Sequence, residues 1–336
     1  MNDLFPKEHF ESWLKAVEKS RKIVLGTHVN PDGDAIGALV GLGLFLKKKG
    51  FEVTLVSPTR YPEFLSFLDP GHEIVVYSQD GQTAEQAIKE ADMIVALDVS
   101  GFSRMDALGK IMLNSKAFKV LIDHHTDPVN KEFDLVFSTT RISSTCELTY
   151  RVIKSWKADA VLSKEQADAF LAGIITDTNQ FANSVYPETF RVTSELVAFG
   201  ADTEFIYDQV YRNFSYNRMR LMGYALQNIR LLPEYKCGYI VLPLDVLAKF
   251  GYSNGDTEGF VNLPLAISGI SVSAFFLQRA DHIKVSLRSK GDIPVNGIAR
   301  EFYQGGGHLN ASAGKMEDSM EEIEPLLKKA LGTIIA

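Results

Sequence analysis

The chain has 336 residues, of which 46% are hydrophobic and 23% are charged, and its formal net charge is −7. This length and composition predict a soluble protein of about two domains with an ample core. The acidic balance argues against a protein that tracks long nucleic acid, because such proteins neutralise phosphates with a basic face.

Neither a leader nor a membrane span is expected. The charged residues Asp3, Lys7 and Glu8 precede any apolar run, unlike in a signal peptide. The apolar segments are also too short to cross a bilayer. The two cysteines, Cys146 and Cys237, stand in unrelated contexts and are expected to be reduced, buried thiols. We therefore expect a cytoplasmic protein.

Strand-like and helix-like patterns alternate over the first half of the chain. In chain order we expect Lys7–Lys19 (helix), Lys22–Thr27 (strand), Ala35–Lys49 (helix), Glu52–Ser57 (strand), Tyr61–Leu68 (helix), Ile74–Tyr77 (strand), Thr83–Glu90 (helix), Met93–Asp98 (strand), Phe118–Ile122 (strand), Leu135–Ser138 (strand), Ile142–Ser155 (helix) and Lys164–Thr178 (helix). This alternation is typical of a parallel α/β sheet. We therefore predict an α/β domain over residues 1–188.

Three metal-ligand residues stand where the first strand passes into the next helix. His28, Asp32 and Asp34 lie in the run Thr-His-Val-Asn-Pro-Asp-Gly-Asp. Its Asn-Pro-Asp-Gly core has turn chemistry that would aim the three side chains at one point. Open α/β sheets place their sites at this carboxyl edge. An alternative is a surface loop in which Asp32 or Asp34 only caps the helix, but that leaves His28 unexplained.

Other acids and histidines also follow element ends. Asp98 ends one strand, Asp123-His124-His125 follows another, and Asp177 ends the helix that begins at Lys164. Asp98 as a helix cap, a pair of structural histidines and Asp177 as an exposed acid are the simpler alternatives. A carboxylate at a helix C-terminus, however, is disfavoured by the helix dipole unless a positive charge compensates it.

The pattern changes in the second half of the chain. Residues 189–230 read as helical and predict a linker, and residues 231–336 predict a smaller α+β domain. Within that domain we expect Tyr239–Leu242 (strand), Ile270–Leu277 (strand), His282–Leu287 (strand) and Met320–Ala330 (helix).

The acids of the first domain are expected to meet at one edge of its sheet. Four converging carboxylates would repel each other and take up protons unless cations were present. Two divalent ions would balance the charges of Asp32, Asp34, Asp98 and Asp177. A mixed carboxylate and imidazole set suits manganese, zinc or iron. Paired ions of this kind are the usual device for in-line displacement at phosphorus.

Taken in order, these motifs resemble those of the DHH phosphoesterase superfamily. The matching residues are His28 to Asp34, Asp98, Asp123-His124-His125 and Asp177, and Gly305-Gly306-Gly307-His308 resembles the GGGH motif of the DHH-associated C-terminal domain. Ser312 departs from the run of alanines that usually follows that motif. The size and the short linker resemble the nanoRNase/oligoribonuclease group, which includes 3′-phosphoadenosine 5′-phosphate phosphatases and cyclic-di-AMP or pApA hydrolases.

The resemblance implies a role for each motif residue. It implies two manganese ions, with magnesium, cobalt or zinc as alternatives. The implied metal ligands are His28 and Asp32 for one ion, Asp34, His124 and Asp177 for the other, and Asp98 as the bridge. His125 would face the phosphate or the attacking water, and Asp123 would orient neighbouring ligands.

The second domain is expected to bind substrate. Its three glycines, Gly305, Gly306 and Gly307, would let backbone N–H groups approach an anion, and His308 would add a donor. Arg279 and Arg288 end strands, and the planar guanidinium group matches phosphate. Arg104, which follows Asp98, is a further phosphate candidate. The alternatives are a flexible turn and solvated strand ends.

We therefore expect a bacterial, cytoplasmic, metal-dependent phosphohydrolase whose site lies in a cleft between its domains. Its expected substrates are short RNA oligonucleotides, pApA and 3′-phosphoadenosine 5′-phosphate, cleaved to nucleoside 5′-monophosphates. A cyclic-di-AMP phosphodiesterase, a RecJ-type single-strand exonuclease and a non-catalytic nucleotide sensor are the alternatives. Neither long nucleic acid nor a membrane is an expected partner, and the relatives suggest a homodimer.

Overall fold

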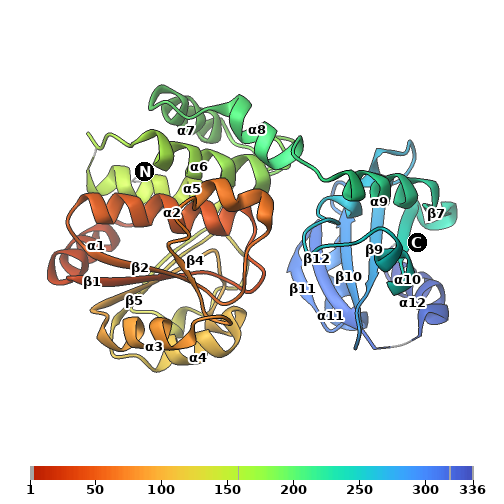
Figure 1. Ribbon diagram of the computed structural model, residues 1–336, viewed down its shortest axis with the longest axis horizontal. Coiled ribbons are helices and arrows are strands. Elements are labelled where there is room, and N and C mark those ends of the chain that lie inside the picture. The colour runs from red at the N-terminus through yellow and green to blue at the C-terminus, as the bar shows by residue number, and fades with distance from the viewer. Residues whose placement is uncertain (1–3, 158, 318, 335–336) are drawn as a thin grey trace. The chain divides into compact units, whose positions relative to one another are not determined.

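The computed structural model describes residues 4–157, 159–317 and 319–334, and the chain divides into two compact units between Asn213 and Phe214 (Figure 1). The first unit contains a parallel sheet covered by helices, and the second contains a mixed sheet. The prediction of an α/β domain followed by a smaller α+β domain is confirmed.

The N-terminal domain alternates strands and helices along the chain, as the sequence predicts. Its strands are β1 (Lys22–Gly26), β2 (Glu52–Ser57), β3 (Ile74–Val76), β4 (Met93–Leu97), β5 (Phe118–Asp123) and β6 (Leu135–Ser138). Its helices are α1 (Lys7–Lys19), α2 (Gly33–Lys48), α3 (Gly81–Glu90), α4 (Asp106–Asn114), α5 (Thr145–Trp156), α6 (Lys164–Asp177), α7 (Pro187–Ala198) and α8 (Thr203–Tyr211), with short 3₁₀ turns η1 (Glu63–Leu68), η2 (Phe102–Met105) and η3 (Asn130–Glu132).

The strands form one parallel sheet in the order β3-β2-β1-β4-β5-β6. Successive side chains of β1 point to opposite faces, so Ile23 and Leu25 join the core under α1, α2, α5 and α6, while Val24 joins the core under α3 and α4 (Figure 1). Both faces are therefore buried, which explains why the strands are almost entirely apolar.

Helices α2 and α6 pack unusually close together. A Cβ atom on Gly37 of α2 would lie 2.4 Å from the carbonyl oxygen of Ala169 in α6, and backbone cannot give way easily. Only glycine fits this contact. The close approach brings Asp34, at the start of α2, towards Asp177, at the end of α6.

Some element boundaries differ from the sequence prediction. Helix α2 begins two residues earlier than expected, because the Asp32 side chain caps it by accepting from the backbone N–H groups of Asp34 and Ala35. Helix α5 begins three residues later than expected, because Ser144 rather than Ile142 sits at its cap.

The C-terminal domain is built around a second six-stranded sheet. Its strands are β7 (Arg230–Leu232), β8 (Cys237–Leu242), β9 (Val272–Gln278), β10 (Ile283–Ser289), β11 (Gly306–His308) and β12 (Ala311–Met316). Its helices are α9 (Tyr216–Gln227), α10 (Leu244–Lys249), α11 (Val295–Phe302) and α12 (Ile323–Leu331), with 3₁₀ turns η4 (Pro233–Tyr235), η5 (Phe260–Ala266) and η6 (Met320–Glu322).

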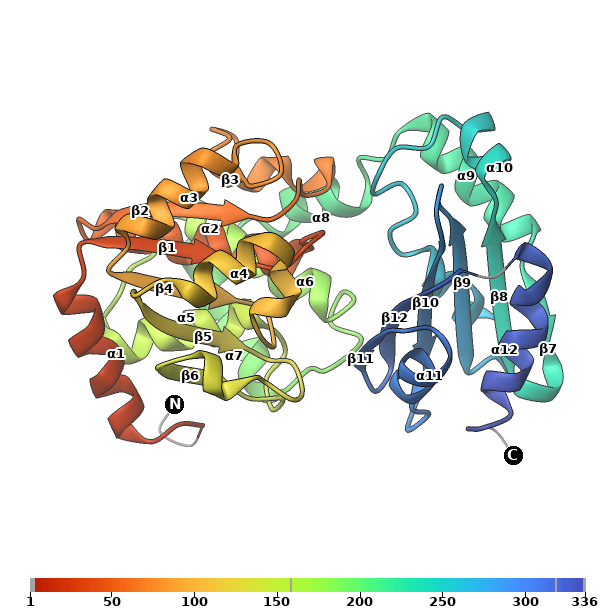
Figure 2. The same cartoon turned by 90° about the horizontal axis from the view of Figure 1, so that it is seen from below.

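This second sheet has the order β11-β12-β10-β9-β8-β7, and β8 and β9 form its parallel pair. Side chains of β9 alternate between two cores. Ala274 and Phe276 pack under α11 and α12, whereas Phe275 and Leu277 face α9, α10 and η5 (Figure 2). The sheet is thus covered on both faces.

The predicted linker over residues 189–230 is distributed over both units. Val192 of α7 and Ile206 of α8 belong to the N-terminal core, whereas Leu221 of α9 belongs to a C-terminal core. Cys146 and Cys237 are both buried and free, as predicted. No helix among the described residues is long and apolar enough to cross a membrane.

Candidate functional site

The candidate site lies at the carboxyl edge of the N-terminal sheet, where the strand order reverses. Strands β2 and β3 follow β1 to one side, whereas β4, β5 and β6 extend to the other. His28 follows β1, Asp98 follows β4 directly, and Asp123 is the last residue of β5. A crevice at such a switch point is where open α/β sheets bind ligands. Asp98 has a φ of +59°. This is a left-handed backbone conformation, which is strained for residues other than glycine.

The first group of side chains joins the segments that follow β1 and β4. One ligand atom from each of His28, Asp32 and Asp98 lies within 4.8 Å of the others. The His28 Nδ1–H group donates to the carbonyl oxygen of Val29 at 2.9 Å, and Nε2 lies 3.4 Å from Asp98 Oδ2. In the neutral ring Nε2 therefore carries the lone pair. Asp32 is exposed, and its Oδ1 is the oxygen that caps α2. The capping alternative is thus realised, but it leaves Oδ2 available.

The second group joins α2, the segment after β5 and the end of α6. Ligand atoms of Asp34, His124 and Asp177 lie within 4.8 Å of one another. His124 Nε2 is 3.9 Å from Asp34 Oδ2, 3.6 Å from Asp98 Oδ1 and 3.5 Å from Asp177 Oδ2. The Asp177 side chain is 26% exposed, and its contact with His124 argues against the alternative of an isolated surface acid.

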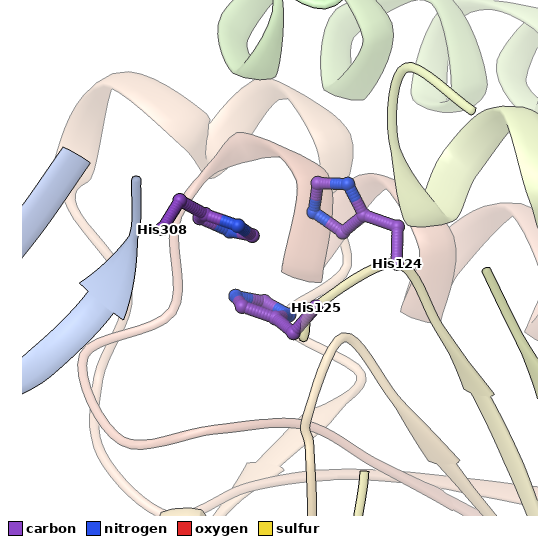
Figure 3. A group of neighbouring side chains, drawn as sticks. All are labelled: His124, His125 and His308. Atoms are coloured by element: carbon purple, nitrogen blue, oxygen red, sulfur yellow. The ribbon is translucent and has the colours of Figure 1, made fainter. Parts of the chain in front are cut away.

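The neighbouring histidines differ in their partners. His125 Nδ1 bonds Asp123 Oδ1 at 2.7 Å and lies 3.6 Å from Asp98 Oδ1, and its backbone N–H donates to Asp123 Oδ2. The rings of His124 and His125 are 4.9 Å apart and inclined by 68°, and they approach each other edge to face (Figure 3). Asp123 is fully buried and therefore fixes the ring of His125.

The charged groups of the site, together with burial, shift each other's pKa values. Burial, together with the charges of Asp98 and Asp177, raises the pKa of Asp34 well above its ordinary value. For Asp98 burial acts in the same direction, but the contact with His28 and the charge of His125 outweigh it and lower the pKa. Burial opposes protonation of His125, yet the Asp123 hydrogen bond and the Asp98 charge raise its pKa to about 9. The surroundings thus shift the pKa values of these two neighbouring carboxylates in opposite directions.

The chemistry of these donors fits divalent cations. Four carboxylates and two imidazoles provide oxygen and nitrogen ligands without any thiolate, a set that suits manganese, magnesium, zinc or iron. The raised pKa of Asp34 also indicates a place where positive charge would displace a proton. The groups formed by His28, Asp32 and Asp98 and by Asp34, His124 and Asp177 could each hold an ion.

The structure adds residues to the site that the sequence pattern did not single out. The backbone N–H groups of Thr145 and Cys146, in the first turn of α5, donate to Asp34 Oδ2 and Oδ1 at 2.7 and 2.8 Å. The Thr145 hydroxyl donates to Asp98 Oδ1 at 2.9 Å. The run Ser143-Ser144-Thr145 with Glu147 was the only signal in the sequence, and it reads as an ordinary helix cap.

Arg104 lies near the metal-ligand groups. Its side chain is exposed, and its positive charge opposes protonation of His125. Its backbone carbonyl accepts a hydrogen bond from Val29 N–H, which joins η2 to the segment that carries His28. Its use as a phosphate contact stays a prediction.

The remaining predicted residues belong to the C-terminal domain. Arg288 is half-buried near the end of β10, where its guanidinium donates to the Leu287 carbonyl oxygen at 3.0 Å. Arg279 follows β9, and its guanidinium lies 5.4 Å from the centre of the Tyr252 ring. His308 is half-buried and ends the short strand β11.

The three glycines before His308 are not equivalent. A Cβ atom on Gly305 would lie 2.0 Å from the Ala313 carbonyl oxygen, so the packing of β11 on β12 itself requires glycine. A Cβ atom on Gly306 would meet nothing within 4 Å. The glycine run is therefore part of a strand pair rather than a flexible turn.

Two family models match the chain. The N-terminal domain of the DHH family matches residues 22–174, and the DHHA1 domain matches residues 237–336. The two matched segments lie in the N-terminal and the C-terminal unit respectively.

Relatives match over nearly their whole lengths. The chain is 30% identical to the bifunctional oligoribonuclease and PAP phosphatase NrnA of Bacillus subtilis, over 94% of this chain and 95% of the relative. It is 33% identical to the protein of the same name from Thermus thermophilus, over 90% of this chain and 86% of the relative. A solved structure, an exopolyphosphatase-related protein from Bacteroides fragilis, superposes with a TM-score of 0.94 at 38% identity, covering 99% of this chain and 98% of that one. With both domains matched and full-length relatives of this similarity, the chain belongs to the DHH family and is an enzyme that hydrolyses phosphoester bonds.

Proposed function

We propose that this enzyme hydrolyses short nucleotides, namely RNA oligonucleotides of a few residues, pApA and 3′-phosphoadenosine 5′-phosphate. Nucleoside 5′-monophosphates are the products, with inorganic phosphate from the bisphosphate. The observation that carries the proposal is the largely buried set of carboxylates and imidazoles at the switch point of the sheet. Relatives named oligoribonuclease and PAP phosphatase support the substrate class.

Two divalent cations, manganese first, are part of the proposal. His28 and Asp32 would hold one ion, Asp34, His124 and Asp177 the other, and Asp98 would serve both. Such ions, when bound, supply positive charge at the phosphate oxygens and lower the pKa of water. The balance between four carboxylates and two divalent charges supports this number of ions.

His125 is proposed to act on the phosphate or on the attacking water. Its Nδ1–H group is held by Asp123, so the ring orientation is fixed, and we assign Nε2 as the atom that meets the substrate. The pKa of about 9 means that the ring carries a positive charge at neutral pH when no cation is bound nearby. A charged ring would donate from Nε2 to a phosphate oxygen, and a neutral ring would accept a proton there.

The C-terminal domain is proposed to hold the rest of the substrate. Arg288 and Arg279 offer planar donor pairs to phosphates, His308 adds a ring donor, and Gly306 leaves open space beside the backbone. The formal charge of −7 favours a short substrate held by a few cations over a long strand. That these residues and the N-terminal group act from the two sides of one cleft stays a prediction.

A substrate panel tests the proposal directly. The purified full-length enzyme is incubated with manganese and, separately, with RNAs of two to ten nucleotides, pApA, 3′-phosphoadenosine 5′-phosphate, cyclic-di-AMP and pyrophosphate. We expect hydrolysis of the short RNAs, pApA and the bisphosphate. Preferred opening of cyclic-di-AMP would assign the enzyme to the cyclic-dinucleotide phosphodiesterases instead. Tight binding of these nucleotides without any hydrolysis would favour a sensor and contradict the proposal.

A further inference from the structure

We infer that Thr145 is a positioning residue that sets the orientation of the Asp98 carboxylate, and that the first turn of α5 holds both central acids of the site. The inference rests on the proposed role of Asp34 and Asp98 as metal ligands. It adds a residue that neither the motifs nor the names of the relatives assign to the site.

The first observation is the direct contact between Thr145 and Asp98. The hydroxyl donates to Asp98 Oδ1 at 2.9 Å, and Thr145 is fully buried while the Asp98 side chain is 3% exposed. Asp98 Oδ1 also lies 3.6 Å from His124 Nε2, whereas Oδ2 lies 3.4 Å from His28 Nε2. The rotation of a carboxylate about its last torsion is soft. A buried hydroxyl on one oxygen therefore determines which oxygen faces which imidazole.

The second observation is that the same turn of helix holds Asp34. The backbone N–H groups of Thr145 and Cys146 each donate to a different oxygen of Asp34. N–H groups in the first turn of a helix have no partner within the helix, and the helix dipole favours negative charge there. One turn of α5 thus fixes the planes of two carboxylates that come from α2 and from the segment after β4.

The third observation is that hydrogen bonds around the buried Glu147 side chain hold this first turn of α5 in place. Glu147 is fully buried, and its Oε2 accepts from the Ser143 N–H group at 3.2 Å and from the Thr189 hydroxyl of α7 at 2.8 Å. Arg151 pairs with the other oxygen of Glu147. Ser144 caps the helix by accepting from the Glu147 N–H group at 3.1 Å. A buried, hydrogen-bonded network of this kind restrains its members, so Thr145 has little freedom to move away from Asp98.

The chain provides a matched control for Thr145. Thr149 lies one turn further along α5 and is also fully buried, but its hydroxyl has no hydrogen-bond partner among the described residues. Thr145→Val and Thr149→Val therefore remove the same atom from the same helix. Only the first removes a donor from a site carboxylate.

The experiment compares the full-length wild-type, Thr145→Val, Thr145→Ser and Thr149→Val proteins after treatment with a chelator. Melting temperature is recorded without metal and against Mn²⁺ concentration, and kcat and KM are measured on pApA. For Thr145→Val we expect one of two changes of about 10–100-fold. Either the Mn²⁺ concentration that gives half of the maximal rise in melting temperature increases, or kcat falls. KM should stay unchanged. Thr145→Ser keeps the donor and should stay within about threefold of the wild type, since the hydrogen bond is retained. Thr149→Val should match the wild type in its Mn²⁺ response and in kcat.

The outcomes separate this inference from the proposed function. Equal Mn²⁺ responses and equal kcat values for Thr145→Val and Thr149→Val would overturn it. A wild type without any Mn²⁺ response would overturn the metal site and this inference together. Should Thr145→Val fail to fold, Thr145→Ala replaces it. A weakened Mn²⁺ response in Thr145→Ala but not in Thr145→Ser supports the inference, and equal responses contradict it.

Discussion

The candidate residues of the two domains are held in different ways. In the N-terminal domain the side chains of Asp34 and Asp98 are 1% and 3% exposed, and backbone or hydroxyl donors fix both of them. In the C-terminal domain Arg288 and His308 are half-buried on strands near one end of the sheet. Groups that perform chemistry need fixed geometry, whereas groups that grip a substrate can adapt to it. The difference agrees with our proposal that the first domain carries the chemistry and the second binds the substrate.

The largest expected effect comes from Asp98→Asn. The change keeps the shape but removes the charge that contacts His28, His124 and His125. If Asp98 serves both ions, kcat should fall by about a thousandfold or more, since several kcal/mol of charge stabilisation are lost. Bound manganese should fall as well, while the circular dichroism spectrum stays unchanged. Full activity in this variant would refute the assignment of Asp98.

Arg288→Ala and His308→Ala should have a smaller effect of a different kind. Each removes a donor that we propose contacts a phosphate or a base. We expect a rise in KM of about 10–100-fold, corresponding to roughly 1.5–3 kcal/mol for a hydrogen bond to a charged group. Manganese binding, measured by titration of the metal-free protein, should equal that of the wild type. Loss of metal from either variant would contradict the assignment of metal binding to the N-terminal domain and of substrate binding to the C-terminal domain.

Two neighbouring glycines of the C-terminal domain should respond differently to replacement by alanine. Gly305→Ala places a Cβ atom 2.0 Å from a carbonyl oxygen of β12, so it should lower stability by about 1–3 kcal/mol or more. Gly306→Ala enters open space and should leave the melting temperature near that of the wild type. If the backbone at Gly306 approaches a phosphate, this second variant should still raise KM. A stable Gly306→Ala with unchanged KM would remove Gly306 from the substrate-binding residues.

The smallest expected effect concerns the length of the RNA substrate. RNAs of two to four nucleotides should be cleaved faster per 5′ end than an RNA of about twenty, since one small binding module reaches only a few nucleotides. The difference should grow at low salt, where the charge of −7 repels the long strand most. Initial rates per end at two ionic strengths measure it. Faster cleavage of the long strand at low salt would indicate a basic track and a processive exonuclease.

Much of the N-terminal fold could be predicted because buried parallel strands are continuous apolar runs, as in Met93–Leu97. Helices α4 and α11 were missed because each is short, with nine and eight residues, and a glycine further weakens so short a helical pattern. In α4 that glycine is required, since a Cβ atom on Gly109 would lie 1.8 Å from the Phe102 carbonyl oxygen. Strands β11 and β12 were missed because Gly306–His308 and Ala311–Met316 have little strand propensity, and pairing within the sheet decides their structure.

The candidate site divides in the same way. His28, Asp98 and Asp177 could be singled out because several acids and histidines follow element ends of one predicted sheet, and together they resemble the motifs of a known family. Thr145 could not, because a threonine in a Ser-Ser-Thr run before a helix is explained by capping alone. Its contact with Asp98 joins residues 47 positions apart in the sequence, and no local pattern predicts such a contact.

We propose that the N-terminal domain works with two divalent cations. Titration of the chelator-treated enzyme with manganese tests it most directly, when bound metal and the rate of pApA hydrolysis are followed in the same samples. Two ions per chain are expected from the carboxylate balance, so both curves should level off near two equivalents, and the metal-free protein should be inactive. Full activity without metal, or full activity at one equivalent with no further binding, would contradict this account.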